Sequence, residues 1–197
     1  MKNEFKHIAK LIKANSKVLE VGCGDGELMK LISNNITSDI RGLEISKKNV
    51  QKCISKGLTV IEGNAEQDLK LFPTSAFDYV ILSQTLQAFL DPENVINEVL
   101  RIGKKAIVTI PNFGYWKVRI HLLIKGTMPV TKSLPNEWYN TPNLHMCTIK
   151  DLFNFCDEKN IIIKKVVGVN ENKTSLIRKS NLEIKNLFSK VGIFLIS

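Results

Sequence analysis

The chain has 197 residues, 44% hydrophobic and 24% charged, a composition that is typical of one globular domain with its own core. Its apolar runs are short and its N-terminal residues alternate apolar side chains with lysines. Neither a membrane span nor a signal peptide is therefore expected, and we place the protein in the cytoplasm. The net charge of +9 comes mainly from lysines scattered over the chain, which argues against nucleic acid as a partner.

The first two thirds of the chain alternate short apolar runs with helical patterns. Strands are predicted at 17–21, 39–45, 58–61, 77–82 and 106–110. Helices are predicted from Gly26 to 33, from an N-cap at Ser46 to Gly57, and from an Asp91-Pro92 cap to Gly103. Such alternation predicts a parallel sheet covered by helices on both faces, whose ligands bind beyond the carboxyl ends of the strands.

The segment 111–147 breaks this alternation. It holds four of the six prolines, both tryptophans and two of the three tyrosines. We predict an amphipathic helix at 113–124, followed by a proline-stiffened segment that lies over the site as an insertion or lid. The apolar stripe of this helix has two open interpretations: it packs on the sheet as core, or it contacts a partner protein.

The last part of the chain begins with a capping box, Thr148-x-x-Asp151, which predicts a helix. Late strands are predicted at 161–169 and 191–196. The lysines after position 159 outnumber the acidic residues there, and we interpret them as a solvated helix face.

Metal binding is not expected. Cys23, Cys53, Cys147 and Cys156 are far apart in the chain and form no CxxC pair. Only His145 lies close to a cysteine, and two ligands do not make a structural zinc site, which needs four. We predict free thiols and no metal.

The stretch EVGCGDG, from Glu20 to Gly26, places three glycines in five residues between a strand and a helix. The Walker pattern is absent. The dinucleotide pattern fails, because the sixth position counted from Gly22 is Glu27. The pattern that fits is acidic-x-Gly-x-Gly-x-Gly, with Gly24 in the middle. It resembles motif I of the class I methyltransferases that depend on S-adenosylmethionine (SAM).

This resemblance implies how SAM or S-adenosylhomocysteine (SAH) would be held. Glu44, at the end of the second strand, matches the carboxylate that accepts from the ribose hydroxyls. Asn64 follows the third strand at the adenine contact, where an aspartate is common. The alternative is that the glycines form only a tight turn and that Glu44 is a surface acid. The cofactor residues expected are Glu20, Gly22, Cys23, Gly24, Gly26, Glu44, Ile45, Asn64, Ala65, Ser83 and Gln84.

No catalytic base stands out. The amino-methylating pattern [ND]-PP-[YFW] is absent after the fourth strand, where Ser83-Gln84-Thr85-Leu86-Gln87 stands instead. The catalytic candidates are His145, Tyr139 and Gln84. Further polar side chains near the strand ends are Gln87, Asn112 and Tyr115.

Three longer stretches narrow the resemblance: FDYVILSQTLQ, IPNFGYWKVRIHLLIKG and MPVTKSLPNEWYNTPNLHMCTIKDL. They are similar to the methionine biosynthesis protein MetW family, from about Val18 to about Val169, while the part from about Asn170 is not covered. The resemblance implies a single domain, 1–197, with a Rossmann-like class I SAM-methyltransferase fold. Its core is at about 17–170, and its seven-stranded, mostly parallel sheet has an antiparallel last strand.

The family resemblance leaves two functions open. Members act with homoserine O-acetyltransferase, so the chain is either a SAM- or SAH-binding accessory subunit of that enzyme or a methyltransferase acting on an unidentified small molecule. We favour the accessory role, because no base is evident and because the aromatic segment 113–147 suits an interface.

Overall fold

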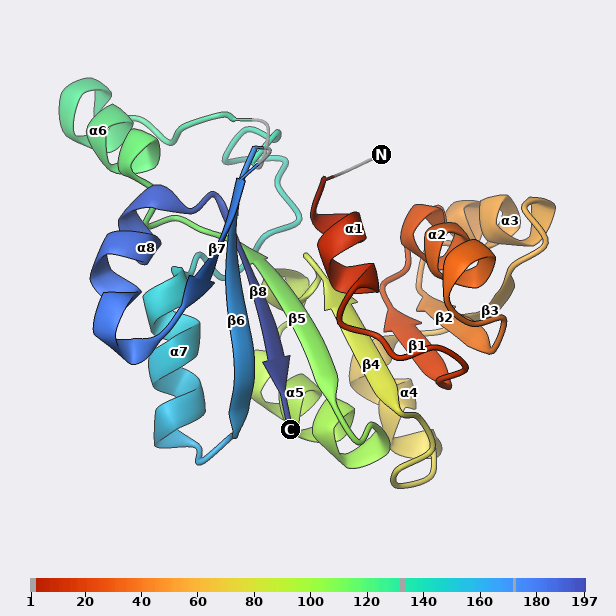
Figure 1. Ribbon diagram of the computed structural model, residues 1–197. Helices are drawn as coiled ribbons and strands as arrows, with labels where there is room; N and C mark the ends of the chain where they lie inside the picture. The colour runs from red at the N-terminus through yellow and green to blue at the C-terminus, as the bar shows by residue number, and fades with distance from the viewer. Residues whose placement is uncertain (1–2, 132–133, 172) are drawn as a thin grey trace.

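The computed structural model describes residues 3–131, 134–171 and 173–197. Within these residues one sheet of eight strands runs through the molecule in the order β3-β2-β1-β4-β5-β8-β6-β7 (Figure 1). The strands are β1 Val18–Val21, β2 Ile40–Glu44, β3 Thr59–Glu62, β4 Tyr79–Ser83, β5 Ala106–Pro111, β6 Ile163–Asn170, β7 Lys173–Ile177 and β8 Val191–Ile196.

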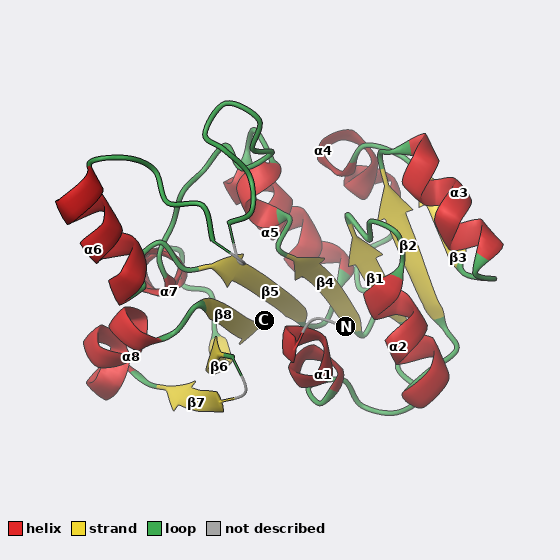
Figure 2. Ribbon diagram, turned by 90° about the horizontal axis from the view of Figure 1, so that it is seen from above, coloured by secondary structure: helices red, strands yellow, loops and turns green. Residues whose placement is uncertain are grey.

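Helices cover both faces of this sheet (Figures 1 and 2). Helices α1, α2 and α3 enclose one apolar cluster, and α4, α5, α7 and α8 enclose the other. In β1, Val18 belongs to the first cluster and Leu19 to the second, as the strand period of two requires. The helices are α1 Asn3–Ala9, α2 Glu27–Asn35, α3 Lys47–Ser55, α4 Ala65–Asp68, α5 Pro92–Ile102, α6 Trp116–Lys125, α7 Ile149–Glu158 and α8 Leu182–Phe188, with 3₁₀ turns η1 Leu69–Leu71, η2 Leu86–Ala88 and η3 Lys179–Asn181.

The fold class predicted from the sequence is confirmed. The first five strands pair in parallel, and β8 lies antiparallel between β5 and β6. The prediction of seven strands is wrong by one, because the edge strand β7 pairs with β6 through a hairpin. Only Leu176 and Ile177 are apolar in KTSLI, so this strand lacks the alternating pattern that would have revealed it.

Two predicted caps have different outcomes. Thr148 and Asp151 form the predicted capping box at the start of α7. Ser46 occupies the N-cap of α3, but its side chain makes no capping hydrogen bond among the described residues. The Ser46 N–H instead donates to Glu44 Oε1 at 2.9 Å, so this end of the helix is tied to the end of β2.

The helix predicted at 113–124 is present as α6, Trp116–Lys125. It lies at the periphery beside α8, far from α2 and α3 (Figures 1 and 2). The interpretation of its apolar stripe as core is wrong for the C-terminal half, since Leu123 is 86% exposed and Ile124 72% exposed. In the part of the chain that the structure describes, no helix is long and apolar enough to cross a membrane.

Candidate cofactor site

The three glycines of the turn after β1 all have positive φ, between 57° and 79°. Gly22 and Gly26 are required for packing: an added Cβ would lie 2.5 Å from Thr85 Cγ2 and 2.5 Å from Leu58 Cδ1, respectively. Gly24 differs, because no described atom lies within 4 Å of its added Cβ. The turn therefore exposes its backbone to open space at Gly24, and this is the position at which a ligand can approach.

Glu44 fixes this turn from the neighbouring strand. Its Oε2 accepts a hydrogen bond from the Gly24 N–H at 2.8 Å, and its Oε1 accepts one from the Ser46 N–H at 2.9 Å. The side chain is buried, so the interpretation of Glu44 as a surface acid is wrong. A carboxylate offers about four lone-pair sites, which leaves each oxygen able to accept a further donor such as a ribose hydroxyl.

The surroundings of the turn are acidic. Glu20 is buried at the end of β1, and burial, with the Glu20 carboxylate nearby, raises the pKa of the Cys23 thiol far above its usual range. Cys23 is therefore a neutral, buried wall of the turn. Two carboxylates, Glu20 and Glu44, close to one glycine turn favour a cationic ligand group there.

The N-terminus of α2 offers the opposite polarity. Gly26 is its N-cap and provides no side-chain oxygen. The Asp25 carboxylate accepts from the Glu27 N–H, so a ligand would use the N–H groups that follow in the first turn. These groups and the helix dipole favour an anionic group. The turn thus places an anion-binding helix end beside two carboxylates, which matches the charges of an amino acid.

The ends of β2 and β3 carry the next predicted residues. Ile45 follows Glu44 and is largely exposed, so its side chain offers an apolar surface beside the turn. Asn64 caps α4, with its Oδ1 accepting from the Glu66 N–H at 3.0 Å. The Asn64 side-chain nitrogen can donate to an adenine edge, and its Oδ1 keeps a second lone pair for a further donor, while Ala65 is buried.

Gln84 directly follows the last residue of β4. It is one of the few non-glycine residues with positive φ, 57°, and its N–H donates to Thr109 Oγ1 at 3.0 Å. Its side-chain Nε2 donates to Glu4 Oε1 at 2.7 Å. Glu4 lies on α1 and was not singled out from the sequence, because a single acid in a lysine-rich segment gives no signal. Helix α1 therefore contacts the strand ends directly.

The three catalytic candidates are not gathered into one constellation. No hydrogen bond joins the side chains of His145, Tyr139 and Gln84 in the described part of the chain. Tyr139 is 71% exposed and packs edge-on against Trp138, with ring centroids 5.7 Å apart. Asn112 is structural: its Nδ2 donates to the backbone oxygens of Asn186 and Ser189, at 2.6 and 2.7 Å.

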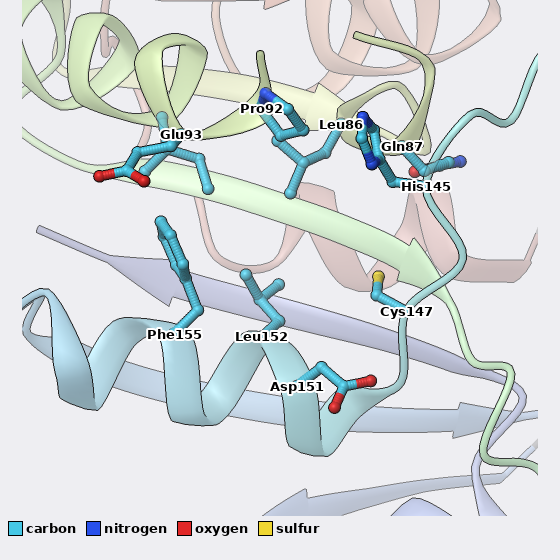
Figure 3. A pocket seen from close by; sticks show the side chains of 10 residues that line it. Leu86, Gln87, Pro92, Glu93, His145, Cys147, Asp151, Leu152 and Phe155 are labelled. Carbon is cyan, nitrogen blue, oxygen red and sulfur yellow. The ribbon is translucent and has the colours of Figure 1, made fainter. Parts of the chain in front are cut away.

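A separate cavity of about 290 Å³ lies between α5 and α7 (Figure 3). Part of its wall is η2, which follows the carboxyl end of β4. There the backbone oxygen of Gln87 accepts from the N–H groups of Leu144 and His145 at 2.8 and 3.0 Å. Its lining consists of Leu86, Gln87, Pro92, Glu93, Ile96, His145, Cys147, Asp151, Leu152 and Phe155. Among residues 3–131, 134–171 and 173–197, no cluster of His, Cys, Asp or Glu suits a metal ion.

The family model of the methionine biosynthesis protein MetW matches residues 2–196. The chain belongs to the MetW family. The match passes Asn170, where the resemblance seen in the sequence ended, so β7, α8 and β8 lie within the region that the MetW family shares.

Curated relatives agree with this assignment. The chain is 33% identical over 169 residues to the bifunctional methionine biosynthesis protein MetXA/MetW of Rhodopirellula baltica, covering 81% of this MetW chain and 27% of that protein. It is 31% identical over 109 residues to the chloroplastic 2-methyl-6-phytyl-1,4-hydroquinone methyltransferase 1 of rice, covering 53% of this chain and 32% of the relative. The MetW chain thus spans about a third or less of the length of these relatives.

Solved structures show the same fold. A SAM-dependent methyltransferase from Thermotoga maritima, described as a possible histamine N-methyltransferase, superposes with a TM-score of 0.69 at 17% identity, over 98% of the MetW chain and 86% of its own. A SAM-dependent methyltransferase from Mesorhizobium loti gives a TM-score of 0.68 at 14% identity, over 98% of the MetW chain and 96% of its own. At these identities the likeness establishes the methyltransferase fold alone.

Proposed function

We propose that this MetW chain binds SAM or SAH at the glycine turn and acts as an accessory subunit of a homoserine O-acetyltransferase. The observation that carries the proposal is the combination of an exposed apolar surface on α6 with a relative in which MetXA and MetW form one bifunctional protein. SAM derives from methionine, so a subunit that senses it suits feedback on the pathway.

The cofactor part rests on the fit between the turn and the ligand. The open space at Gly24 allows an adenosyl–methionine moiety to lie against the backbone. The α2 N-terminus suits the carboxylate of the ligand, Glu20 its ammonium group, and Glu44 its ribose hydroxyls. Bound there, SAM would supply a methyl group on a cationic sulfur, whereas SAH has no such methyl group and its sulfur is neutral.

The partner part rests on two exposed groups, which we name the α6 face (Ile120, Leu123, Ile124) and the aromatic turn (Trp138, Tyr139). Trp138 is 72% exposed. Clustered exposed apolar side chains with aromatics are typical of the centre of a protein interface. Lys117 and Lys125 flank the α6 face and add a basic rim.

The position of α6 refines the expected role of 113–147. Both views place α6 away from the glycine turn (Figures 1 and 2), so the helix itself does not cover that turn. The returning segment reaches the strand ends through the N–H groups of Leu144 and His145, which donate to the Gln87 backbone oxygen. Apart from residues 132–133, which lie outside the described residues, the segment divides into an outer part for a partner and an inner part near the site.

A second candidate function is methyl transfer to a small molecule. The cavity between α5 and α7 favours it, because its lining includes Leu86 and Gln87, which follow the carboxyl end of β4, and the glycine turn follows the carboxyl end of β1 at the same edge of the sheet. In-line transfer is accelerated by positioning, and an acceptor that is already nucleophilic needs no base.

The experiment that tests the proposal combines the purified chain with homoserine O-acetyltransferase from the same organism. Sedimentation velocity with and without SAH measures association, and acetyl transfer from acetyl-CoA to homoserine measures its effect. Association that changes with SAH supports the accessory role, because linkage makes the two affinities reciprocal. No association, together with SAH formation from SAM and a small acceptor, establishes the second candidate.

A further inference from the structure

A second groove, of about 320 Å³, lies between α1 and the hairpin of β6 and β7, and we name it the α1–β7 groove. Its cationic side chains are His7 on α1, Lys10 directly after α1, and Lys165 on β6. No carboxylate is among the described residues that line it. A cleft lined by charge of one sign concentrates ions of the opposite sign, so this groove favours an anion.

The register of the sheet explains why these residues meet. Lys165 pairs with Leu195, and Thr174 pairs with Val169. Leu195 and Val169 are part of the apolar cluster on which α1 packs (Figure 2). Directly paired residues share a face of the sheet, so Lys165 and the Thr174 hydroxyl lie on the face that α1 covers.

The cations of the groove have no acidic partner. None of the ion pairs in the part of the chain that the structure describes involves His7, Lys10 or Lys165. Lys179 and Lys190, elsewhere in the C-terminal part of the chain, each pair with a carboxylate. The α1–β7 groove therefore has a positive charge that the described residues leave unbalanced.

His7 responds to this charge. Burial, and then the cations of Lys10 and Lys6, lower its pKa. Glu4 is the acid of α1, but its Oε1 accepts from Gln84 Nε2 at 2.7 Å. The only charged residues of β6 and β7 are lysines, and β8 has none. A bound anion would relieve the repulsion and raise the pKa of His7.

The rest of the groove indicates the size and charge of its ligand. Leu11, Val167 and Leu176 provide an apolar floor for an organic group. The two lysine charges match a phosphate monoester, which carries about −1.5 to −2 at pH 7 and has three acceptor oxygens. A volume of about 320 Å³ is within the range of small-molecule sites, about 300–1,000 Å³.

We propose that the α1–β7 groove binds a small phosphate monoester, with its phosphate between Lys10 and Lys165 and its organic group on the apolar floor. The groove shares no lining residue with the glycine turn. Binding there requires neither SAM nor a partner protein, so its test is separate from that of the proposed function.

Three probes test the site in the full chain without cofactor: phenyl phosphate, phenyl sulfate and inorganic phosphate. Phenyl sulfate has nearly the same shape with one charge fewer, and inorganic phosphate lacks the organic group. At about pH 8 and low ionic strength, we expect phenyl phosphate to bind saturably and about tenfold more tightly than either of the others. NMR titration of the imidazoles should show that phenyl phosphate raises the pKa of His7 and leaves His121 and His145 unchanged.

Lys165→Gln tests the cation, and Lys164→Gln is the control, because Lys164 is exposed on the same strand and does not line the groove. We expect Lys165→Gln to weaken phenyl phosphate binding about threefold to tenfold and Lys164→Gln to change it little. Equal affinities for the phosphate and the sulfate, an unchanged His7 pKa, or equal losses in both variants would overturn the proposal. Binding to vesicles that contain phosphatidic acid, without binding of phenyl phosphate, would also overturn it and assign the groove to a lipid surface.

Discussion

The Gly24 N–H donates to Glu44 Oε2 at 2.8 Å, which joins the turn after β1 to the end of β2. The register explains the contact: Val21 pairs with Leu43, and the Gly22 N–H donates to the Leu43 oxygen at 2.7 Å. Gly22, which follows Val21, and Glu44, which follows Leu43, therefore lie at the same edge of the sheet. The hydrogen bond fixes the glycine turn and the Glu44 carboxylate relative to each other.

Gly24 in this turn and Gly57 outside it both have left-handed backbone conformations, but we expect only Gly24 to matter for cofactor binding. Gly24 and Gly57 have φ of 57° and 72°, and no described atom lies within 4 Å of an added Cβ at either. Alanine at either position costs about 1–2 kcal/mol of stability through backbone strain. Only Gly24→Ala is expected to weaken SAM and SAH binding severely, because its methyl group enters the space beside the turn. Calorimetry measures binding, and urea unfolding measures stability.

Gly57→Ala is the matched control, since it carries the same strain outside the site. If both variants bind SAH as the wild type does, the open space at Gly24 is not the ligand position. If both lose binding equally, the loss comes from strain and not from the added methyl group.

Glu44→Ala is expected to weaken SAM and SAH binding by about 1–3 kcal/mol, because charge-assisted hydrogen bonds to the ribose are lost. It should also lower the free energy of unfolding, since the N–H groups of Gly24 and Ser46 lose their acceptor. Glu62 pairs directly with Glu44 across β2 and β3 and is exposed, so Glu62→Ala is the control. Calorimetry that finds equal losses for both variants would contradict the role of Glu44.

Much of this architecture could be predicted because each signal is local. The parallel strands are nearly continuous apolar runs, and the capping box of Thr148 and Asp151 requires only four residues. The glycine turn was located for the same reason. The different roles of the three glycines could not be predicted. The packing of Gly22 on Thr85 and of Gly26 on Leu58 depends on residues far along the chain.

What could not be predicted depends on tertiary placement. The stripe of α6 has helical spacing whether it is buried or exposed, and only the fold shows that Leu123 faces solvent. Gln87 is one of the polar residues near the strand ends, and only the fold shows that its Oε1 is buried without a hydrogen-bond partner among the described residues. The contact of Glu4 with Gln84 joins residues 80 positions apart.

The stability of the sheet should depend on pH through Asp78. A hydrogen bond from Lys104 Nζ at 2.8 Å, with one from the Lys17 N–H at 2.9 Å, holds the pKa of this carboxyl below its usual value. A lowered folded-state pKa stabilises the protein above the unfolded value of about 3.9, and this stabilisation is lost as the pH falls through the folded-state pKa.

Asp78→Asn should therefore lower the free energy of unfolding at pH 7 by at most about 1 kcal/mol, since the side chain is partly exposed. The difference from wild type should shrink as the pH falls below the unfolded pKa of about 3.9 and be lost as the pH passes the lowered folded-state pKa. Urea unfolding between pH 7 and pH 3 measures both. Asp157→Asn, which removes a pairing with Lys179 at the open surface, should change little at any pH. A difference for Asp78→Asn that persists unchanged at pH 3 would assign the effect to packing.

The proposed interface predicts that Leu123→Ser, on the α6 face, weakens association with homoserine O-acetyltransferase at least tenfold. An apolar side chain at the centre of an interface contributes about 1–3 kcal/mol, whereas an exposed one adds little to folding. Leu71, on η1, is far from α6 in the sequence and is 74% exposed. Leu71→Ser therefore controls for the loss of an exposed apolar side chain outside the proposed interface. Sedimentation velocity measures association, and thermal unfolding shows that each variant remains folded.

The aromatic turn provides an independent test of the proposed interface. Trp138 and Tyr139 contact each other, so the effects of Trp138→Ala and Tyr139→Ala should not add, and the double variant should weaken association less than the sum of the two. If both single variants and Leu123→Ser hold the acetyltransferase as tightly as wild type does, the interface lies elsewhere. If only the aromatic variants weaken association, the aromatic turn is the contact and α6 is not. Loss in all three, with Leu71→Ser unchanged, is the result that the exposed surface of this chain predicts.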